Sequence, residues 1–147
     1  MTNNFIHLNL HSQYSIVDST IRIPQLMKEC IKNNMPAITL TDQNNVFGMV
    51  KFYRKALEYG IKPIIGTDIF LADEDDATRC DRITLLCANN NGYQNLTQLI
   101  TRAWLDGQKR HGPRLHKSWF NKENCKGLIA LSAGLKGDIG RSLMNGH

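Results

Sequence analysis

Side chains able to bind metal ions or move protons follow several apolar stretches of this 147-residue chain. They come in groups at the ends of these stretches: His11 and Ser12, Thr41 and Asp42, Thr67 and Asp68, and Ser132. Imidazole and carboxylate groups are good metal ligands and good acid–base groups. Loops are polar in general, but sites in α/β folds lie at the C-terminal ends of strands, so the repeated pattern favours a site.

Neutral amides stand beside the candidate ligands in two places. Asn9 precedes His11, and Gln43 follows Asp42. An amide is a weak ligand compared with imidazole, which suits Zn²⁺, or a carboxylate, which suits harder ions. The sequence therefore raises the question of whether a catalytic scaffold persists without its chemistry. Each remaining candidate also has a structural interpretation: His11 as a residue lining an empty pocket, and Asp42 as a backbone acceptor or helix cap.

Strand-like and helix-like stretches alternate along the chain. The pattern predicts strands at 4–10, 37–40, 63–70, 83–88 and 128–132, and helices at 23–33, 46–59, 93–107, 118–123 and 138–145. Pro24 suits a first helical turn, and Gly60 suits a helix C-terminus. We expect a turn at 89–92, a loop at 111–114 and a polar link at 73–81. This order predicts an α/β fold with mainly parallel strands and crossover helices.

Composition excludes several classes of protein. No run approaches the roughly 18 apolar residues that a membrane span needs, and the first residues lack a signal-peptide pattern, so we expect a cytoplasmic protein without membrane contact. The cysteines form no CxxC pair, which argues against a zinc knuckle or a disulfide framework. Cys30 and Cys87 are predicted to be buried thiols.

A net charge of +5 makes the chain mildly basic. The cations concentrate late in the chain: Arg102, Lys109, Arg110, Arg114, Lys117, Lys122 and Lys126. Such a cluster is either a phosphate-binding surface or an ordinary solvated face. Few aromatic residues accompany it, so a platform for stacking nucleic-acid bases is disfavoured.

Four segments in consistent order resemble the PHP (polymerase and histidinol phosphatase) domain. They are His-Leu-Asn-Leu-His-Ser-Gln-Tyr-Ser from His7, Thr-Asp-Gln-Asn-Asn-Val-Phe-Gly from Thr41, Ile-Lys-Pro-Ile-Ile-Gly-Thr-Asp from Ile61, and Gly-Tyr-Gln-Asn-Leu from Gly92. Together they are similar to the amino-terminal end of bacterial DNA polymerase III alpha subunits. The resemblance implies that residues 1–147 are the N-terminal part of a distorted (β/α)7 PHP barrel, with the remaining strands and the polymerase domains beyond this chain.

The resemblance also identifies which metal ligands are altered. Two histidines of the first motif map to Asn9 and His11, the Asp-His pair of the second to Asp42 and Gln43, and the glutamate of the third to Asp68. A further histidine maps near Arg82 and a cysteine near Gly134. Because metal catalysis needs several imidazole or carboxylate ligands at fixed geometry, the resemblance implies a degenerate site with no catalytic residue and no bound metal.

The resemblance finally implies a function for the whole protein. That function is DNA-templated DNA synthesis with Mg²⁺ at a distant polymerase site, in a replicase with other subunits and DNA. This segment would be structural and would dock the proofreading exonuclease (epsilon) subunit. Two alternatives remain: an active metal-dependent phosphoesterase or 3′–5′ exonuclease using His11, Asp42 and Asp68, and a free-standing enzyme similar to histidinol phosphatase.

Overall fold

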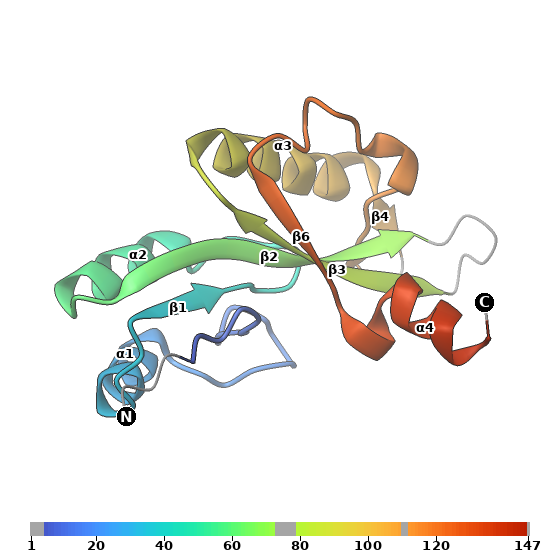
Figure 1. Cartoon of the computed structure of the whole chain (residues 1–147). Coiled ribbons are helices and arrows are strands. Elements are labelled where there is room, and N and C mark those ends of the chain that lie inside the picture. The colour runs from blue at the N-terminus through green and yellow to red at the C-terminus, as the bar shows by residue number, and fades with distance from the viewer. Residues whose placement is uncertain (1–4, 73–78, 110–111, 147) are drawn as a thin grey trace. The chain divides into compact units, whose positions relative to one another are not determined.

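The structure is a computed structural model that describes residues 5–72, 79–109 and 112–146. It divides into two compact units, Met1–Thr67 and Asp68–His147, which are described separately. The helices and most strands of both are labelled in Figure 1. In the part of the chain that the structure describes, no helix is long and apolar enough to cross a membrane.

The first unit pairs two helices with two parallel strands. Helix α1 spans Ile23–Lys32, strand β1 Ala37–Leu40, helix α2 Met49–Glu58 and strand β2 Lys62–Ala72. β1 runs parallel to the start of β2, in the register Ala37↔Lys62 to Leu40↔Ile65. The helices present apolar residues at helical spacing to this pair, because side chains three, four or seven positions apart share a face. The resulting core contains Ile23, Met27, Cys30, Ile38, Leu40, Phe52, Ala56 and Ile61.

The first unit corrects two of our expectations. Residues 5–10 form no strand, although one was predicted at 4–10. Leu10 hydrogen-bonds to Thr41 instead: the Thr41 N–H donates to the Leu10 carbonyl at 2.8 Å, and the Leu10 N–H donates to Thr41 Oγ1 at 2.8 Å. The Thr41 hydroxyl thus accepts the hydrogen bond that the carbonyl of a neighbouring strand would accept from the Leu10 N–H in a β-ladder. Helix α2 begins at Met49 rather than near Val46, and Gly60 follows it at φ +68°, as its position predicts.

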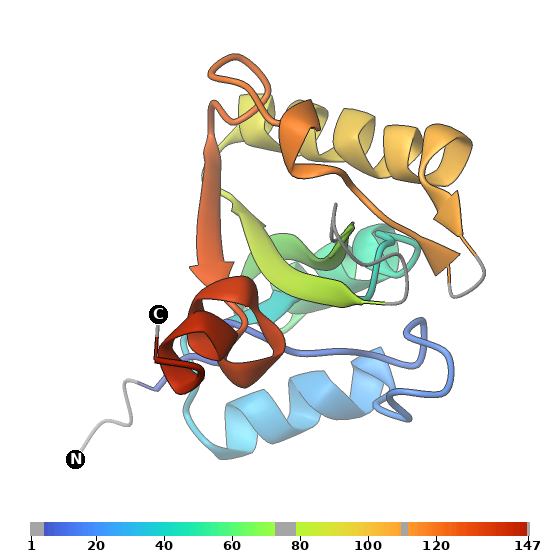
Figure 2. The ribbon, with the colours of Figure 1, turned by 90° about the vertical axis from the view of Figure 1, so that its right-hand side faces the viewer.

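The second unit is built on antiparallel strands. It contains the end of β2, strand β3 at Cys80–Cys87, helix α3 at Asn90–Asp106 and strand β6 at Leu128–Ser132. β3 and β6 are antiparallel, from Ile83↔Ser132 to Cys87↔Leu128. Figure 2 shows α3 alongside these two strands. The α/β class is confirmed, but the pairing is mixed rather than mainly parallel.

Contacts at the start of α3 explain the reversed direction of β6. The Asn95 side-chain amide donates to the carbonyl of Lys126 at 2.9 Å, and the Ala88 N–H donates to the Gly127 carbonyl at 2.9 Å. The chain therefore returns to the end of β3 before β6 begins, so β6 must run back along β3. The turn predicted at 89–92 is wrong, because these residues form the start of α3. Asn89 caps this helix by accepting from the Gly92 N–H at 3.0 Å.

Short elements complete the second unit. They are β4 at Gln108–Lys109, β5 at Gly112–Pro113, the 3₁₀ turns η1 at Lys117–Trp119 and η2 at Gly134–Lys136, and helix α4 at Asp138–Met144. β4 and β5 pair antiparallel, where part of a loop was predicted, and η1 replaces the helix predicted at 118–123. The acidic part of the predicted link, residues 73–76, lies outside the described residues.

The thiol of Cys87, at the end of β3, is partly buried, and this burial raises its pKa to about 11. We expect iodoacetamide to alkylate Cys87 at least about tenfold more slowly at pH 8 than the exposed Cys125. The rate at Cys87 should keep rising up to about pH 11, because the reactive thiolate forms only near the raised pKa. The Cys87 thiol stays protonated to a higher pH in the folded chain than in the unfolded chain. Its contribution to the stability of the folded chain is therefore present below pH 9 and is lost as the pH rises to about 11. Peptide mass spectrometry of the labelled chain measures both rates, and equal rates at pH 8 would contradict the prediction.

Candidate functional site

Thr41 joins the first two sequence motifs at the end of β1. Its side chain is fully buried, and its hydrogen bonds to both backbone groups of Leu10 fix the segment that carries Asn9 and His11. Asn9 is exposed, whereas the His11 side chain is 12% exposed. Two of the predicted site residues, Asn9 and His11, therefore flank Leu10, whose backbone is fixed by Thr41.

Asp42 is the central acceptor of the first unit. Its carboxylate is buried and accepts three hydrogen bonds: from the Ser12 N–H at 2.6 Å, from Ser12 Oγ at 2.8 Å and from Ser15 Oγ at 2.6 Å. The predicted role as an acceptor of backbone N–H groups is confirmed. The predicted helix cap is wrong, because α2 follows Gly48 and has no side-chain cap.

Gln43 takes part in the same network through its backbone. Its N–H donates to Ser15 Oγ at 3.0 Å, and its carbonyl accepts from the Asn45 side-chain amide at 2.8 Å. Ser15 thus links the carboxylate of Asp42 to the backbone of the next residue. The position that carries histidine in the resembled motif is here integrated into a hydrogen-bonded turn.

His11 has a carboxylate partner that the sequence reasoning missed. Its Nδ1 faces Oδ2 of Asp18, and the Ser19 hydroxyl donates to the His11 carbonyl at 2.7 Å. A carboxylate behind one ring nitrogen fixes the orientation of an imidazole, as it does in metal-binding histidines. His11 and Asp18 are seven positions apart in a turn, where no helix or strand periodicity predicts a contact. Apart from its residue type, nothing in the sequence therefore indicated Asp18 as the partner.

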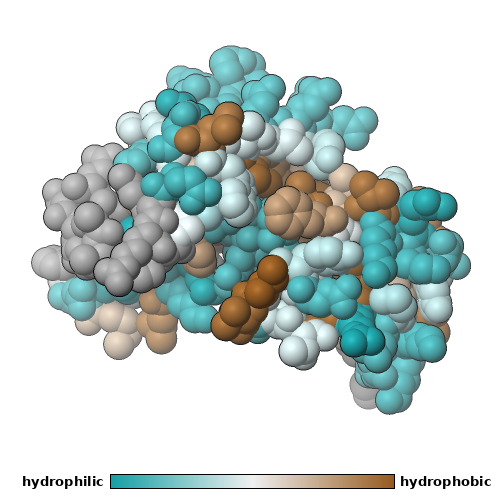
Figure 3. Space-filling view, turned by 180° about the vertical axis from the view of Figure 1, so that it is seen from behind, coloured by the Kyte–Doolittle hydropathy of each residue, from teal (hydrophilic) through white to brown (hydrophobic). Residues whose placement is uncertain are grey.

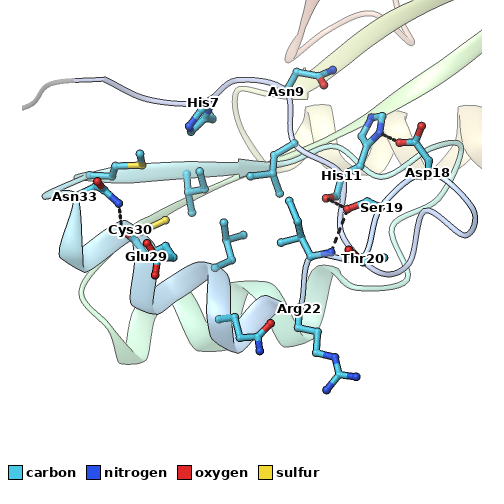
Figure 4. A pocket seen from close by; sticks show the side chains of 16 residues that line it. His7, Asn9, His11, Asp18, Ser19, Thr20, Arg22, Glu29, Cys30 and Asn33 are labelled. Carbon is cyan, nitrogen blue, oxygen red and sulfur yellow. Dashed lines mark hydrogen bonds and ion pairs between the residues drawn. The ribbon is translucent and has the colours of Figure 1, made fainter.

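A cavity of about 800 Å³ lies beside these residues in the first unit. Figure 4 shows it between the N-terminal segment and α1, with His11 and Asp18 facing each other at one side. Apolar side chains, among them Leu26 and Ile38, form much of its lining, and His7 and Asn9 add polar groups. The cavity thus combines an apolar interior with several titratable side chains in its lining, among them His11, Asp18 and Glu29.

Asp68 belongs to the second unit. It is buried in β2, and its Oδ1 accepts a hydrogen bond from Thr84 Oγ1 on β3 at 2.5 Å. Arg82, predicted near the metal ligands, lies with its guanidinium carbon 5.1 Å from the ring centroid of Phe70. Gly134 opens η2 and brings no side chain. Asp68 is thus held by a neighbouring strand.

The donor set does not fit the metal cluster that intact copies of the resembled motifs would bind. Both oxygens of Asp42 and Oδ1 of Asp68 accept protein hydrogen bonds, and Asn9 and Gln43 offer amides. Within the described residues, no three His, Cys, Asp or Glu side chains gather in an arrangement that could hold a metal ion. We therefore derive no catalytic step through a metal.

The late cationic cluster is partly used inside the second unit. Arg114 is buried and donates from Nη1 to the Arg79 carbonyl at 3.0 Å, so it is not a surface cation. Arg102 lies over the Trp119 ring at 4.2 Å. Lys117 pairs with Asp138 at 2.7 Å, and this bond lowers the pKa of that carboxyl. These three cations are thus engaged within the second unit, whereas Arg110 and the side chain of Lys109 lie outside the described residues.

Comparison with known proteins identifies the family. The family model described as "PHP domain" matches residues 7–147. The chain belongs to the PHP domain family. Relatives described as DNA polymerase III subunit alpha are 44% identical over 147 residues in Pseudomonas aeruginosa, 46% over 143 in Vibrio cholerae and 42% over 143 in Escherichia coli K12. These alignments cover 97–100% of this chain but only 12% of each relative, so the chain spans about an eighth of their length.

Solved structures show the fold alone. A putative metal-dependent phosphoesterase from Bifidobacterium adolescentis has a TM-score of 0.51 at 21% identity, covering 71% of this chain and 35% of that one. An amidohydrolase from Chromobacterium violaceum has a TM-score of 0.52 at 16% identity, covering 67% and 32%. The expected partial PHP barrel is thus confirmed as a fold.

Proposed function

We propose that this chain is the amino-terminal PHP segment of a replicative DNA polymerase alpha subunit, and that it has no hydrolytic activity of its own. The observation that carries the proposal is the 44% identity to such a subunit over all 147 residues. Residues 1–147 would be the N-terminal part of a PHP domain, with the rest of the barrel and the polymerase domains following. The full protein would act in the cytoplasm and use Mg²⁺ at its polymerase site.

The altered ligands support the absence of hydrolysis. A metal centre that polarises phosphate and generates hydroxide needs several imidazole or carboxylate ligands. Here Asn9 and Gln43 replace two of them, and Asp42 is engaged by Ser12 and Ser15. We therefore assign the segment a structural role and propose that it docks the proofreading exonuclease (epsilon) subunit, alongside other replicase subunits and DNA bound by the full protein.

Metal content and activity test this proposal. We expect the full-length protein, purified without chelator, to synthesise DNA on a primed template and to carry far less than one zinc or manganese ion per PHP domain. The double substitution Asn9→His and Gln43→His should raise zinc affinity, although Asp42 must first exchange its serine partners. Elemental mass spectrometry and hydrolysis of bis-p-nitrophenyl phosphate are the measurements. A stoichiometric ion together with hydrolysis that is lost in His11→Ala would favour the phosphoesterase or 3′–5′ exonuclease alternative.

A further inference from the structure

Asn91 and Gly92 form an asparagine–glycine pair in the first turn of α3. Asparagine is chemically labile, and a following glycine, which has no Cβ, leaves its own backbone nitrogen unshielded and conformationally free. In such a pair the glycine nitrogen attacks the side-chain carbonyl carbon of the asparagine. A carbon–nitrogen bond forms, the bond to the side-chain nitrogen breaks, and that nitrogen leaves with the glycine proton as ammonia. The cyclic imide that results takes up water and opens to aspartate or isoaspartate.

Packing requires glycine at residue 92. A Cβ there would collide with the carbonyl of Gly127, the residue just before β6. Figure 2 shows the chain before β6 lying beside the start of α3. The labile pair therefore cannot be removed by a larger residue at position 92 without moving this junction of the second unit.

Two features of the start of α3 oppose the reaction. The Gly92 N–H donates to Oδ1 of Asn89 at 3.0 Å, so the attacking nitrogen is held by the cap. An N–H in the first turn has no acceptor within its own helix, and this side-chain bond takes the place of one. The attack also requires Asn91 to leave helical φ and ψ, because its ψ must turn the Gly92 nitrogen toward the Asn91 side chain. Both constraints end when the first turn of α3 opens.

The folded chain has room for the reactants but none for isoaspartate. Asn91 is exposed, and the surface over α3 is mostly hydrophilic (Figure 3). Isoaspartate routes the backbone through the side chain and so adds one carbon atom between residue 91 and Gly92. That extra atom would displace Gly92 from Gly127, whose carbonyl accepts from the Ala88 N–H at 2.9 Å. Once isoaspartate has formed, the first turn can no longer return to its packed position.

We propose that Asn91–Gly92 is a latent deamidation site that the Asn89 cap keeps unreactive. Opening of the first turn of α3 releases the Gly92 N–H and allows the imide to form. Isoaspartate then makes the opening irreversible. The cap thus sets the rate at which the second unit ages chemically, whatever the function of the chain.

Peptide mass spectrometry of the full-length protein, aged in mildly alkaline buffer, tests the site. We expect Asn91 to deamidate at least about tenfold more slowly in the folded protein than in the same protein unfolded in urea, because only opened molecules react. Asn89→Ala removes the cap and should raise the rate in the folded protein about fivefold. Asn89→Asp keeps an acceptor for the Gly92 N–H, so its rate should stay near that of wild type. The matched control is Asn90→Ala, which leaves the bond from Gly92 to Asn89 in place and should also react like wild type.

The outcomes decide between a guarded site and an ordinary one. Equal rates in folded and unfolded wild type would overturn the proposal, because α3 would then give no protection. Equal rates in wild type and Asn89→Ala would overturn the role of the cap. If Asn89→Ala does not fold, Asn89→Gly removes the acceptor with little loss of helix stability, and a rate no higher than that of wild type would overturn the proposal in the same way.

Discussion

Replacement of Asp42 by alanine is expected to destabilise the chain by about 3–5 kcal/mol, one of the two largest effects that we predict. The carboxylate is buried and accepts from the Ser12 N–H, Ser12 Oγ and Ser15 Oγ at 2.6–2.8 Å. Alanine leaves these donors without their acceptor in a buried site. Each unsatisfied donor costs about 1–3 kcal/mol of stability, and the costs are not additive. Urea unfolding followed by circular dichroism measures the loss.

An exposed carboxylate provides the matched control for Asp42. Asp106 has a 63% exposed side chain and lies 3.8 Å from Arg102. Its replacement by alanine should change stability by less than about 0.5 kcal/mol, because exposed ion pairs contribute little. If the two variants were equally stable, Asp42 would not be a structural acceptor, and the assignment of the site as a folded remnant would fail.

Local patterns predicted those elements whose causes lie within a few residues. Strand β1 at Ala37–Leu40 and strand β6 at Leu128–Ser132 have the bounds that their apolar runs indicate. Helix α1 ends one residue before the predicted bound, at Lys32. The two strands are short apolar runs and α1 is amphipathic, so local apolar patterning is sufficient to place them.

Features decided by distant residues were missed. The predicted strand at 4–10 depended on a partner, and its residue Leu10 instead bonds to Thr41, a residue 31 positions away. The antiparallel direction of β6 depends on the return of the chain to Asn95 and Gly92. Sequence periodicity contains no information on which segment lies beside another, so the order of strands and helices favoured parallel pairing.

In the candidate site, too, local sequence predicted some features and missed those that depend on distant residues. Residue types at Asn9, His11, Asp42, Gln43 and Asp68 predicted where polar groups lie, and the structure places the first four in one unit. The partners Ser12, Ser15 and Asp18 were not predicted, because a side chain's hydrogen bonds depend on loop geometry. A carboxylate that follows a strand can cap the next helix, or it can accept hydrogen bonds from an earlier turn. Spacing in the sequence alone does not distinguish the two.

Gly92→Ala is the other substitution with a large expected effect, and two physical terms oppose each other in it. Gly92 lies in the first turn of α3, where alanine would raise helix propensity by about 1 kcal/mol. A Cβ on Gly92, however, would lie 1.8 Å from the Gly127 carbonyl oxygen and 2.5 Å from its carbon. These distances are far inside van der Waals contact, so the backbone at Gly127 would have to move.

That backbone has little freedom to move, which decides the sign. The Gly127 carbonyl accepts from the Ala88 N–H at 2.9 Å, and the next residue, Leu128, pairs with Cys87 in the β3–β6 ladder. A shift would break these bonds and also displace Asn89, whose side chain caps α3. We therefore expect Gly92→Ala to destabilise by about 2–4 kcal/mol net of propensity. Asn91→Ala, exposed in the same helical turn, should instead stabilise by about 0.5 kcal/mol, because only propensity acts there. Urea unfolding of both variants tests the argument: if Gly92→Ala matched Asn91→Ala, Gly127 would not lie against α3 as the structure has it.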